Sequence, residues 1–223
     1  GIYGFQLICG FIFLFSLNKF LSKLKYYELG FIIFVPIGLI IGAMGFIAQT
    51  LALSFGMLAI NAILDKKNFH YFIFVILSTL SHIAGAFFLI FFLTIYKIKK
   101  KNIFKISIII LSVFIIIYLT NMDRLNMTFH WYLGEGKHFS SKGVIPRYLL
   151  SLIPACIFLF YIKNKLKNNV EKNIYTIYSY LTLLLLPLIF TASSFVDRLN
   201  LFIIPLQAFV ITSLIAHVHS INI

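Results

Sequence analysis

This chain of 223 residues is too apolar for a soluble domain, since 61% of its residues are hydrophobic and only 11% are charged. Apolar runs of this extent exceed what a core of this size covers, so the composition predicts a polytopic membrane protein. The net charge of +13 does not indicate a nucleic-acid partner, because most lysines stand in short clusters between apolar runs, where they orient a membrane protein.

Four lysine clusters divide the apolar sequence and mark the loops expected on the cytoplasmic side of the membrane. They are Lys19, Lys23 and Lys25; Lys66 and Lys67; Lys97, Lys99, Lys100, Lys101 and Lys105; and Lys163, Lys165, Lys167 and Lys172. Between successive clusters the chain has to cross the membrane and return. Each interval is therefore expected to hold two spans and an outer turn.

The intervals predict an all-α protein with about nine transmembrane helices in a single transmembrane domain, residues 1–223. In chain order the spans are 1–17, 28–43, 47–64, two short arms within 69–96, 103–120, 147–162, 173–191 and 199–218. The chain starts at Gly1, without a methionine, and enters an apolar run at once. We therefore expect it to be incomplete at its N-terminal side.

Residues 69–96 look like one long apolar helix, yet they join two lysine clusters, and a single crossing would put those clusters on opposite sides. A break at Ser81-His82, close to Gly85, gives two arms of about 13 residues, each roughly 20 Å long as an α-helix. The sequence thus predicts a short hairpin with His82 at its outer tip. A histidine in that place needs a partner or a cavity.

The three arginines, Arg124, Arg147 and Arg198, are all predicted on the face opposite the lysine clusters. A guanidinium presents a planar fork of donors that matches phosphate or carboxylate oxygens, so the set is a candidate anion site. Each arginine also has a local explanation. Arg147 suits an interfacial anchor at the start of its span, and Arg124 and Arg198 each follow an aspartate, Asp123 and Asp197, that suits a local ion pair.

The longest polar segment, residues 121–146, is predicted to be an external loop. Besides Asp123 and Arg124 it contains Trp131, Glu135, His138 and Lys142. Trp131 suits either an interfacial belt or a platform on which a sugar stacks. His138 lies in a stretch rich in glycine and serine, where a solvated histidine is the ordinary alternative to a site residue.

Several chemical signatures do not occur in the sequence. A P-loop, HExxH, Gly-x-Ser-x-Gly and a paired-aspartate Asp-x-Asp are all missing, which removes support for ATP-driven pumping, zinc proteolysis and serine hydrolysis. The acidic residues lie in loops or at their margins, which weakens a proton-coupled transporter. We expect no metal and no other cofactor.

Two short motifs stand in a fixed order over most of the chain. The first is Gly45-Phe46-Ile47-Ala48-Gln49-Thr50-Leu51-Ala52, followed by a lysine-bearing turn and an apolar run ending at Ser81-His82-Ile83-Ala84. The second is Asp197-Arg198-Leu199, which leads into an apolar span containing Pro205. In order and spacing the chain resembles the EpsG-like branch of the Wzy-type bacterial polysaccharide polymerases, which make O-antigen, capsule or exopolysaccharide.

One position departs from the pattern of that family. An arginine usually precedes the glutamine, and here Ala48 precedes Gln49. Either this member does without that guanidinium, or the residue was substituted to give an inactive form, since alanine offers neither charge nor hydrogen bonds to a phosphate. The family's histidine matches His82 and its late arginine matches Arg198.

The resemblance implies a membrane glycosyltransferase in the bacterial inner membrane, with its active site facing the periplasm or exterior. It would transfer a growing glycan from undecaprenyl pyrophosphate onto the sugar of another lipid-linked repeat unit. We expect Arg198 and Arg147, with Arg124 in reserve, to stabilise the pyrophosphate, and His82, or else Glu135 or His138, to act as base. Expected substrate contacts are Ala48, Gln49, Asp123, Arg124, Trp131, His138, Lys142 and Asp197.

Beyond the lipid-linked oligosaccharide and the bilayer, the expected partners are a chain-length regulator and a flippase. A GT-C-like architecture is expected by analogy alone. Two other functions stay open. A ligase that moves a finished glycan needs the same donor site, and a flippase or transporter of the lipid-linked oligosaccharide would bind it without catalysis, although that predicts more polar spans than these.

Overall fold

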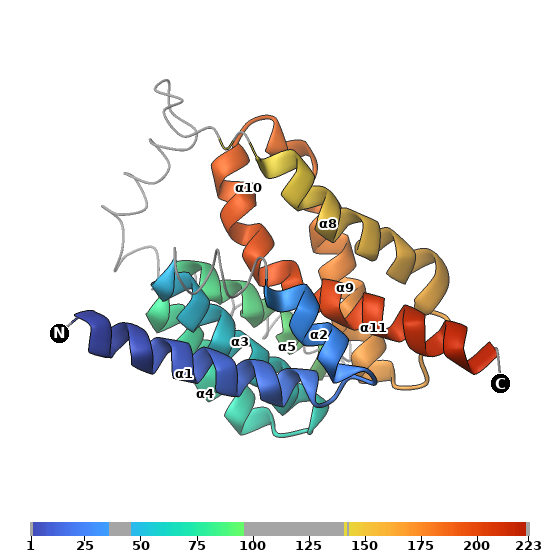
Figure 1. The fold of residues 1–223 in the computed structure, drawn as a ribbon, viewed down its shortest axis with the longest axis horizontal. Helices are drawn as coiled ribbons and strands as arrows, with labels where there is room; N and C mark the ends of the chain where they lie inside the picture. Colours follow the sequence, from blue (N-terminus) through green and yellow to red (C-terminus); the bar gives the residue numbers. More distant parts are fainter. Residues whose placement is uncertain (1, 36–45, 96–140, 142, 222–223) are drawn as a thin grey trace, which may run out of the picture.

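A computed structural model of the chain describes residues 2–35, 46–95, 141 and 143–221, and the regular elements among them are all helical (Figure 1). The first half contains α1 (Ile2–Leu21), α2 (Tyr27–Phe34), α3 (Ile47–Leu64), α4 (Asn68–Ser81), the 3₁₀ helix η2 (Ile83–Phe91) and α5 (Phe92–Ile95). The second half contains α8 (Val144–Ile157), the π-helical η3 (Phe158–Ile162), α9 (Asn169–Leu185), η4 (Pro187–Ile189), α10 (Ser193–Asn200), η5 (Leu201–Ile203) and α11 (Ile204–Ile221). The predicted all-α class is confirmed for this part of the chain.

Four helical segments in the described ranges are long and apolar enough to cross a membrane. They are Tyr3–Leu21, Ile47–Leu64, Val144–Ile162 and Ser193–Val218. By the length and composition of these helices, the chain is a multi-pass membrane protein. The predicted span at 103–120 and most of the predicted loop at 121–146 lie outside the described residues. The count of nine spans and the GT-C-like architecture therefore stay predictions.

The predicted break in residues 69–96 is confirmed. Helix α4 ends at Ser81, His82 is extended with φ −159° and ψ 137°, and η2 begins at Ile83. The arms run antiparallel, because the Tyr71 hydroxyl donates hydrogen bonds to the carbonyl oxygens of Phe88, at 2.8 Å, and Leu89, at 3.3 Å. The second arm is mostly a 3₁₀ helix, whose rise of about 2.0 Å per residue gives a short arm more length than an α-helix.

Close approach within this hairpin depends on Gly85. A Cβ atom at this position would lie 2.3 Å from the backbone oxygen of Ser78, a distance that real Cβ atoms do not adopt. Gly56 plays the same part between α3 and η2, since its Cβ would lie 1.9 Å from the ring of Phe88. Small residues at such contacts let membrane helices pack closely, and they bring α4 and η2 against α3.

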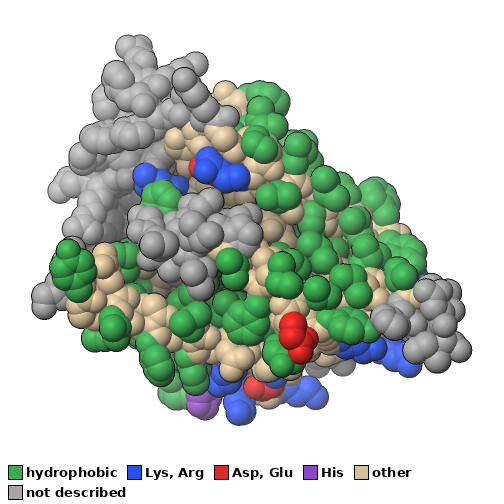
Figure 2. All heavy atoms as spheres, viewed as in Figure 1, with side chains coloured by type: hydrophobic (Ala, Val, Ile, Leu, Met, Phe, Trp, Pro, Cys, Tyr) green, Lys and Arg blue, Asp and Glu red, His purple; other side chains and the backbone are tan. Residues whose placement is uncertain are grey.

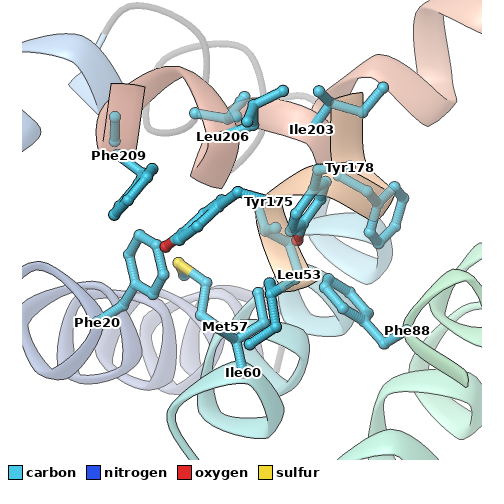
Figure 3. Packing of buried hydrophobic residues seen from close by; sticks show 14 of the residues in the cluster. Phe20, Leu53, Met57, Ile60, Phe88, Tyr175, Tyr178, Ile203, Leu206 and Phe209 are labelled. Carbon is cyan, nitrogen blue, oxygen red and sulfur yellow. The ribbon is translucent and has the colours of Figure 1, made fainter. Parts of the chain in front are cut away.

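The core of the described part is aromatic and lies around α3. Tyr175 and Tyr178 of α9 point into the space between α3 and α11, where Tyr175 stacks on Phe209 with an interplanar angle of 9° (Figure 3). Phe88 packs edge-on against Phe202, with ring centroids 5.8 Å apart. This packing fixes the two halves of the described chain against each other, and it therefore fixes the ends of α3, η2 and α10 relative to one another.

On the face drawn in Figure 2, the basic side chains of the described part lie in two separate areas, with apolar surface between them. The turns after α1, α3 and α8 lie together on the side of the C-terminus, away from α10 (Figure 1). There Lys23 forms a salt bridge with Asp65, and Lys165 Nζ lies 2.6 Å from His217 Nε2. We call this side the lysine end. The side with α10 and the start of α8 is the arginine end.

Candidate functional site

Arg147 lies in the first turn of α8 and is held by a small polar network. Its Nη2 donates hydrogen bonds to Asp197 Oδ2 and to Ser141 Oγ, both at 2.8 Å. The Ser141 hydroxyl in turn donates to Asp197 Oδ2 at 3.0 Å, and its backbone N–H donates to Ser193 Oγ at 3.1 Å. These bonds join the residues before α8 to α10, so the guanidinium has a fixed direction.

The ion pair differs from both local explanations suggested by the sequence. Arg147 is not a simple interfacial anchor, because it binds a carboxylate from another helix. Asp197 does not serve only its neighbour Arg198, because its carboxylate lies on Arg147, 50 positions away. An ion pair between sequence neighbours can be predicted from the sequence alone. A pair between α8 and α10 forms only when the two helices pack together.

The guanidinium of Arg147 keeps binding capacity after this pairing. Its Nε is buried and has no hydrogen-bond partner in the part of the chain that the structure describes. A Cβ on Gly143 would lie 3.1 Å from Nη2, so the side chain folds back over a glycine. A buried donor without a partner costs free energy, about 1–3 kcal/mol, unless a ligand or water fills it.

Below Arg147 a second polar network joins three helices. The Asn200 side-chain N–H donates to the backbone oxygen of Arg147 at 3.0 Å, the Ser151 hydroxyl donates to Asn200 Oδ1, and Gln207 Nε2 donates to Ser151 Oγ at 2.6 Å. Ser151, Asn200 and Gln207 are almost completely buried. The network links α8, α10 and α11 directly beneath the arginine end.

Sequence reasoning missed the members of both networks, namely Ser141, Ser151, Ser193, Asn200 and Gln207. A signal for two of them was present. Ser151 and Gln207 are polar residues inside apolar spans, and such residues usually face a partner within the bundle. No comparable signal marks Ser141, whose role depends on the tertiary contact with Asp197.

His82 and Gln49 form the second part of the site. Gln49, in the first turn of α3, is only 4% exposed, and its Nε2 lies 3.5 Å from His82 Nε2. On its other side the ring is fixed, because the backbone N–H of Ala84 donates to Nδ1 at 3.1 Å. A neutral histidine that accepts at Nδ1 carries its proton on Nε2, so a donor faces Gln49.

The side-chain oxygen of Gln49, Oε1, is buried and has no partner among the described residues. With Oε1 turned toward the ring, the amide would accept from the His82 Nε2–H, and both groups would be satisfied. His82 itself lies in the break between α4 and η2, outside both helices. Burial, and secondly the positive charge of Arg198, lower the pKa of His82, so the neutral ring is the form present at neutral pH.

Arg198 lies in the last turn of α10, and its guanidinium carbon is 6.0 Å from the ring centroid of Phe46, the residue before α3. The structure thus brings together five residues that the sequence selected: Gln49, His82, Arg147, Asp197 and Arg198. We call these five, with Ser141, the arginine site. Ala48 is exposed beside Gln49 in the first turn of α3, where the fold leaves room for a longer side chain.

The other selected residues lie outside the described part of the chain. They are Asp123, Arg124, Trp131, Glu135, His138 and Lys142. Their expected contacts remain predictions. Within residues 2–35, 46–95, 141 and 143–221 no group of three histidine, cysteine or acidic side chains is arranged to hold a metal ion.

This geometry defines the class of the protein. It is a multi-pass helical membrane protein with a cationic polar site at one end of its helices. A family model, the EpsG family, matches residues 1–222, and the chain belongs to that family. The resemblance drawn from the motifs is thereby confirmed. The family places the chain among polymerase-type, glycosyltransferase-like membrane proteins of polysaccharide biosynthesis. Comparison with curated proteins and with solved structures gave no match.

Proposed function

We propose that the chain polymerises lipid-linked oligosaccharide repeat units. It would transfer the growing glycan from undecaprenyl pyrophosphate onto a sugar hydroxyl of another lipid-linked unit, at the external face of the bacterial inner membrane. The observation that supports this most is the arginine site, where Arg147 and Arg198 lie with His82 and Gln49 at the end opposite the lysines. Family membership supports the reaction class.

The reaction requires charge stabilisation on the leaving group. The anomeric C–O bond breaks, its electron pair stays on the pyrophosphate, and the acceptor hydroxyl forms the new bond to the anomeric carbon and releases a proton. Guanidiniums that are already oriented stabilise the developing charge without reorganising. Asp197 and Ser141 orient Arg147, whose buried Nε is a donor that a phosphate oxygen would fill.

For His82 the tautomer favours a role other than the base expected from the sequence. A base needs a lone pair, and the lone pair on Nδ1 already accepts from the Ala84 N–H. The Nε2–H is a donor, which we assign to an oxygen of the donor lipid or of a sugar, with Gln49 holding the ring in the free protein. The base would then be Glu135 or His138 of the predicted external loop.

An assay with the purified full-length protein and defined lipid-linked repeat units tests the proposal, read out as glycan chain length. We expect a ladder of products that each differ by one repeat unit. A single transfer onto a different acceptor would favour the ligase. Movement of the lipid-linked unit across a vesicle membrane, without any glycan transfer, would favour the flippase and would overturn the polymerase.

A further inference from the structure

A cavity of about 350 Å³ lies at the lysine end, away from the arginine site. The turn between α1 and α2, the turn between α8 and α9, and helix α11 all contribute to its lining. The charged residues of the lining, with its tyrosine and its histidine, are Lys23, Lys25, Tyr161, Lys165, Glu171 and His217. A volume of this size accommodates a small molecule or a lipid headgroup.

Lys165 is held in place at the cavity, although its side chain is exposed. Its Nζ lies 2.6 Å from His217 Nε2 and 3.3 Å from the centroid of the Tyr161 ring. An ammonium only donates hydrogen bonds, so the ring nitrogen accepts, while the tyrosine face attracts the cation. A lysine that only oriented the protein in its membrane would need neither contact.

The lining carries a net positive charge. Three lysines face one carboxylate, Glu171, so two positive charges remain, and one remains after the salt bridge of Lys23 with Asp65 is counted. The cavity therefore attracts anions. The carboxylate of Glu171 weakens that attraction. Removal of its charge should therefore strengthen anion binding, whereas loss of a lysine should weaken it.

Apolar side chains form the rest of the lining, among them Leu24, Ile162, Leu166 and Phe209. A cationic rim over an apolar wall, at the ends of helices long enough to cross a membrane, matches a ligand that has both a phosphate and a hydrocarbon part. The ends of helices that cross a membrane are expected in the polar headgroup region of the bilayer.

We propose that this cavity binds the phosphate group of an anionic ligand at the lysine end, with Lys25 and Lys165 holding the phosphate and Leu166 and Phe209 contacting an apolar portion. A phospholipid headgroup and a soluble phosphate share this chemistry, and the experiment separates them. The site does not depend on the function proposed for the arginine site.

Native mass spectrometry of the purified full-length protein in detergent tests the site, with phosphatidylglycerol, phosphatidylcholine and inorganic phosphate as probes. We expect phosphatidylglycerol to bind in preference to phosphatidylcholine. Lys25→Gln and Lys165→Gln should each weaken binding about threefold, which is typical of one exposed charge contact, and Glu171→Gln should strengthen it about threefold. Competition by inorganic phosphate would identify a soluble source, and binding without such competition would identify the lipid headgroup.

Lys167→Gln is the matched control, because Lys167 belongs to the same lysine cluster but not to the lining, and we expect no change in binding. Lys165→Arg keeps the charge and should retain binding. Equal affinity for both lipids overturns the proposal. So does phosphatidylglycerol binding that is the same in the Lys25, Lys165 and Glu171 variants as in the unaltered chain, with each variant checked for an unaltered elution profile.

Discussion

At the scale of single residues, the arginine site depends on pairs that fix direction as well as charge. One guanidinium nitrogen of Arg147 holds both Asp197 and Ser141, and one ring nitrogen of His82 is occupied by a backbone N–H. In both cases the protein fixes one side of the functional group; the Nε of Arg147 has no partner among the described residues, and the other ring nitrogen of His82 faces Gln49. This is the arrangement expected of preorganised electrostatic stabilisation.

Asp197→Asn tests the orienting role of the carboxylate. We expect kcat for glycan transfer to fall about tenfold or more, because a charge-assisted hydrogen bond worth about 1.5–3 kcal/mol is replaced at best by a weaker neutral one and Arg147 is held less firmly. KM for the anionic donor should not rise, because the site loses a negative charge. Asp65→Asn, the same change at the lysine end, should leave both constants unaltered. A higher KM with unchanged kcat for Asp197→Asn would contradict the orienting role.

Two variants of His82 separate the donor role from the base role. A glutamine amide reaches the position of the ring Nε2 and keeps a donor there, whereas an asparagine amide reaches only Nδ1. We expect His82→Gln to keep activity within about tenfold of the unaltered protein, and His82→Asn to lose more, since one neutral hydrogen bond is worth about 1 kcal/mol. Equal inactivity of His82→Gln and His82→Ala would instead favour the base.

The pH profile gives an independent check on His82. Because its pKa is lowered in the folded protein, the neutral donor is present at neutral pH and becomes protonated only as the pH falls through that lowered value. The Ala84 hydrogen bond is then lost and activity should decline. His82→Gln should lack this acid-side decline, as measured by transfer rates across the acid range. An identical decline in this variant would assign the titration to another group.

At the scale of helices, a buried polar network fixes the backbone that presents Arg147. Ser151 is its centre, because it donates to Asn200 and accepts from Gln207, and Asn200 then binds the Arg147 carbonyl. Interhelical hydrogen bonds of this kind are worth about 0.6 kcal/mol each in membrane proteins. Their larger effect here is geometric, since they hold α8, α10 and α11 in register.

Ser151→Ala should lower both the melting temperature in detergent and the rate of glycan transfer. The substitution leaves polar groups of Asn200 and Gln207 buried without a partner, at about 1–3 kcal/mol. Ser179→Ala is the matched control, because Ser179 is equally buried but its hydroxyl bonds to the Tyr175 carbonyl of its own helix. Equal effects of the two substitutions would show that the network has no special role.

The α4–η2 hairpin depends on Gly85 in a way that a single substitution tests. Gly85→Ala places a Cβ against the Ser78 backbone, so we expect destabilisation of about 1–3 kcal/mol and loss of the folded yield in detergent. Gly10→Ala in α1 is the control, because a Cβ there meets nothing within 4 Å. Unaltered stability of the Gly85 variant, measured by thermal unfolding, would contradict this packing.

The helices also show which features the sequence could predict. The break at His82 followed from the lysine clusters, because charge topology required the chain to return to the same side. The sequence did not predict the 3₁₀ form of the second arm. When every face of a helix is hydrophobic, the periodicity of apolar residues says little about the type of helix. Arg147 and Asp197 were both selected, but their pairing arises from packing between α8 and α10, about which residue order gives no information.

At the scale of the whole molecule, the described part has two polar ends joined by apolar helices. The lysine end has a cavity lined by cations, and the arginine end has the oriented guanidinium of Arg147, the second guanidinium of Arg198 and a neutral histidine. Between the two ends, α1 exposes apolar side chains such as Tyr3, Leu7 and Phe11, which suit contact with lipid. Family membership and this division support an enzyme that works at one face of a membrane.

In the proposed reaction, Arg198 and Arg147 stabilise the pyrophosphate leaving group. The most direct measurement is the single-turnover rate of glycan transfer from a lipid-linked repeat unit by Arg198→Gln, compared with Arg198→Lys and the unaltered protein. We predict a fall of about 100-fold or more for Arg198→Gln, as for loss of one oxyanion donor, and partial recovery for Arg198→Lys. A transfer rate for Arg198→Gln equal to that of the unaltered protein would show that Arg198 does not stabilise the leaving group.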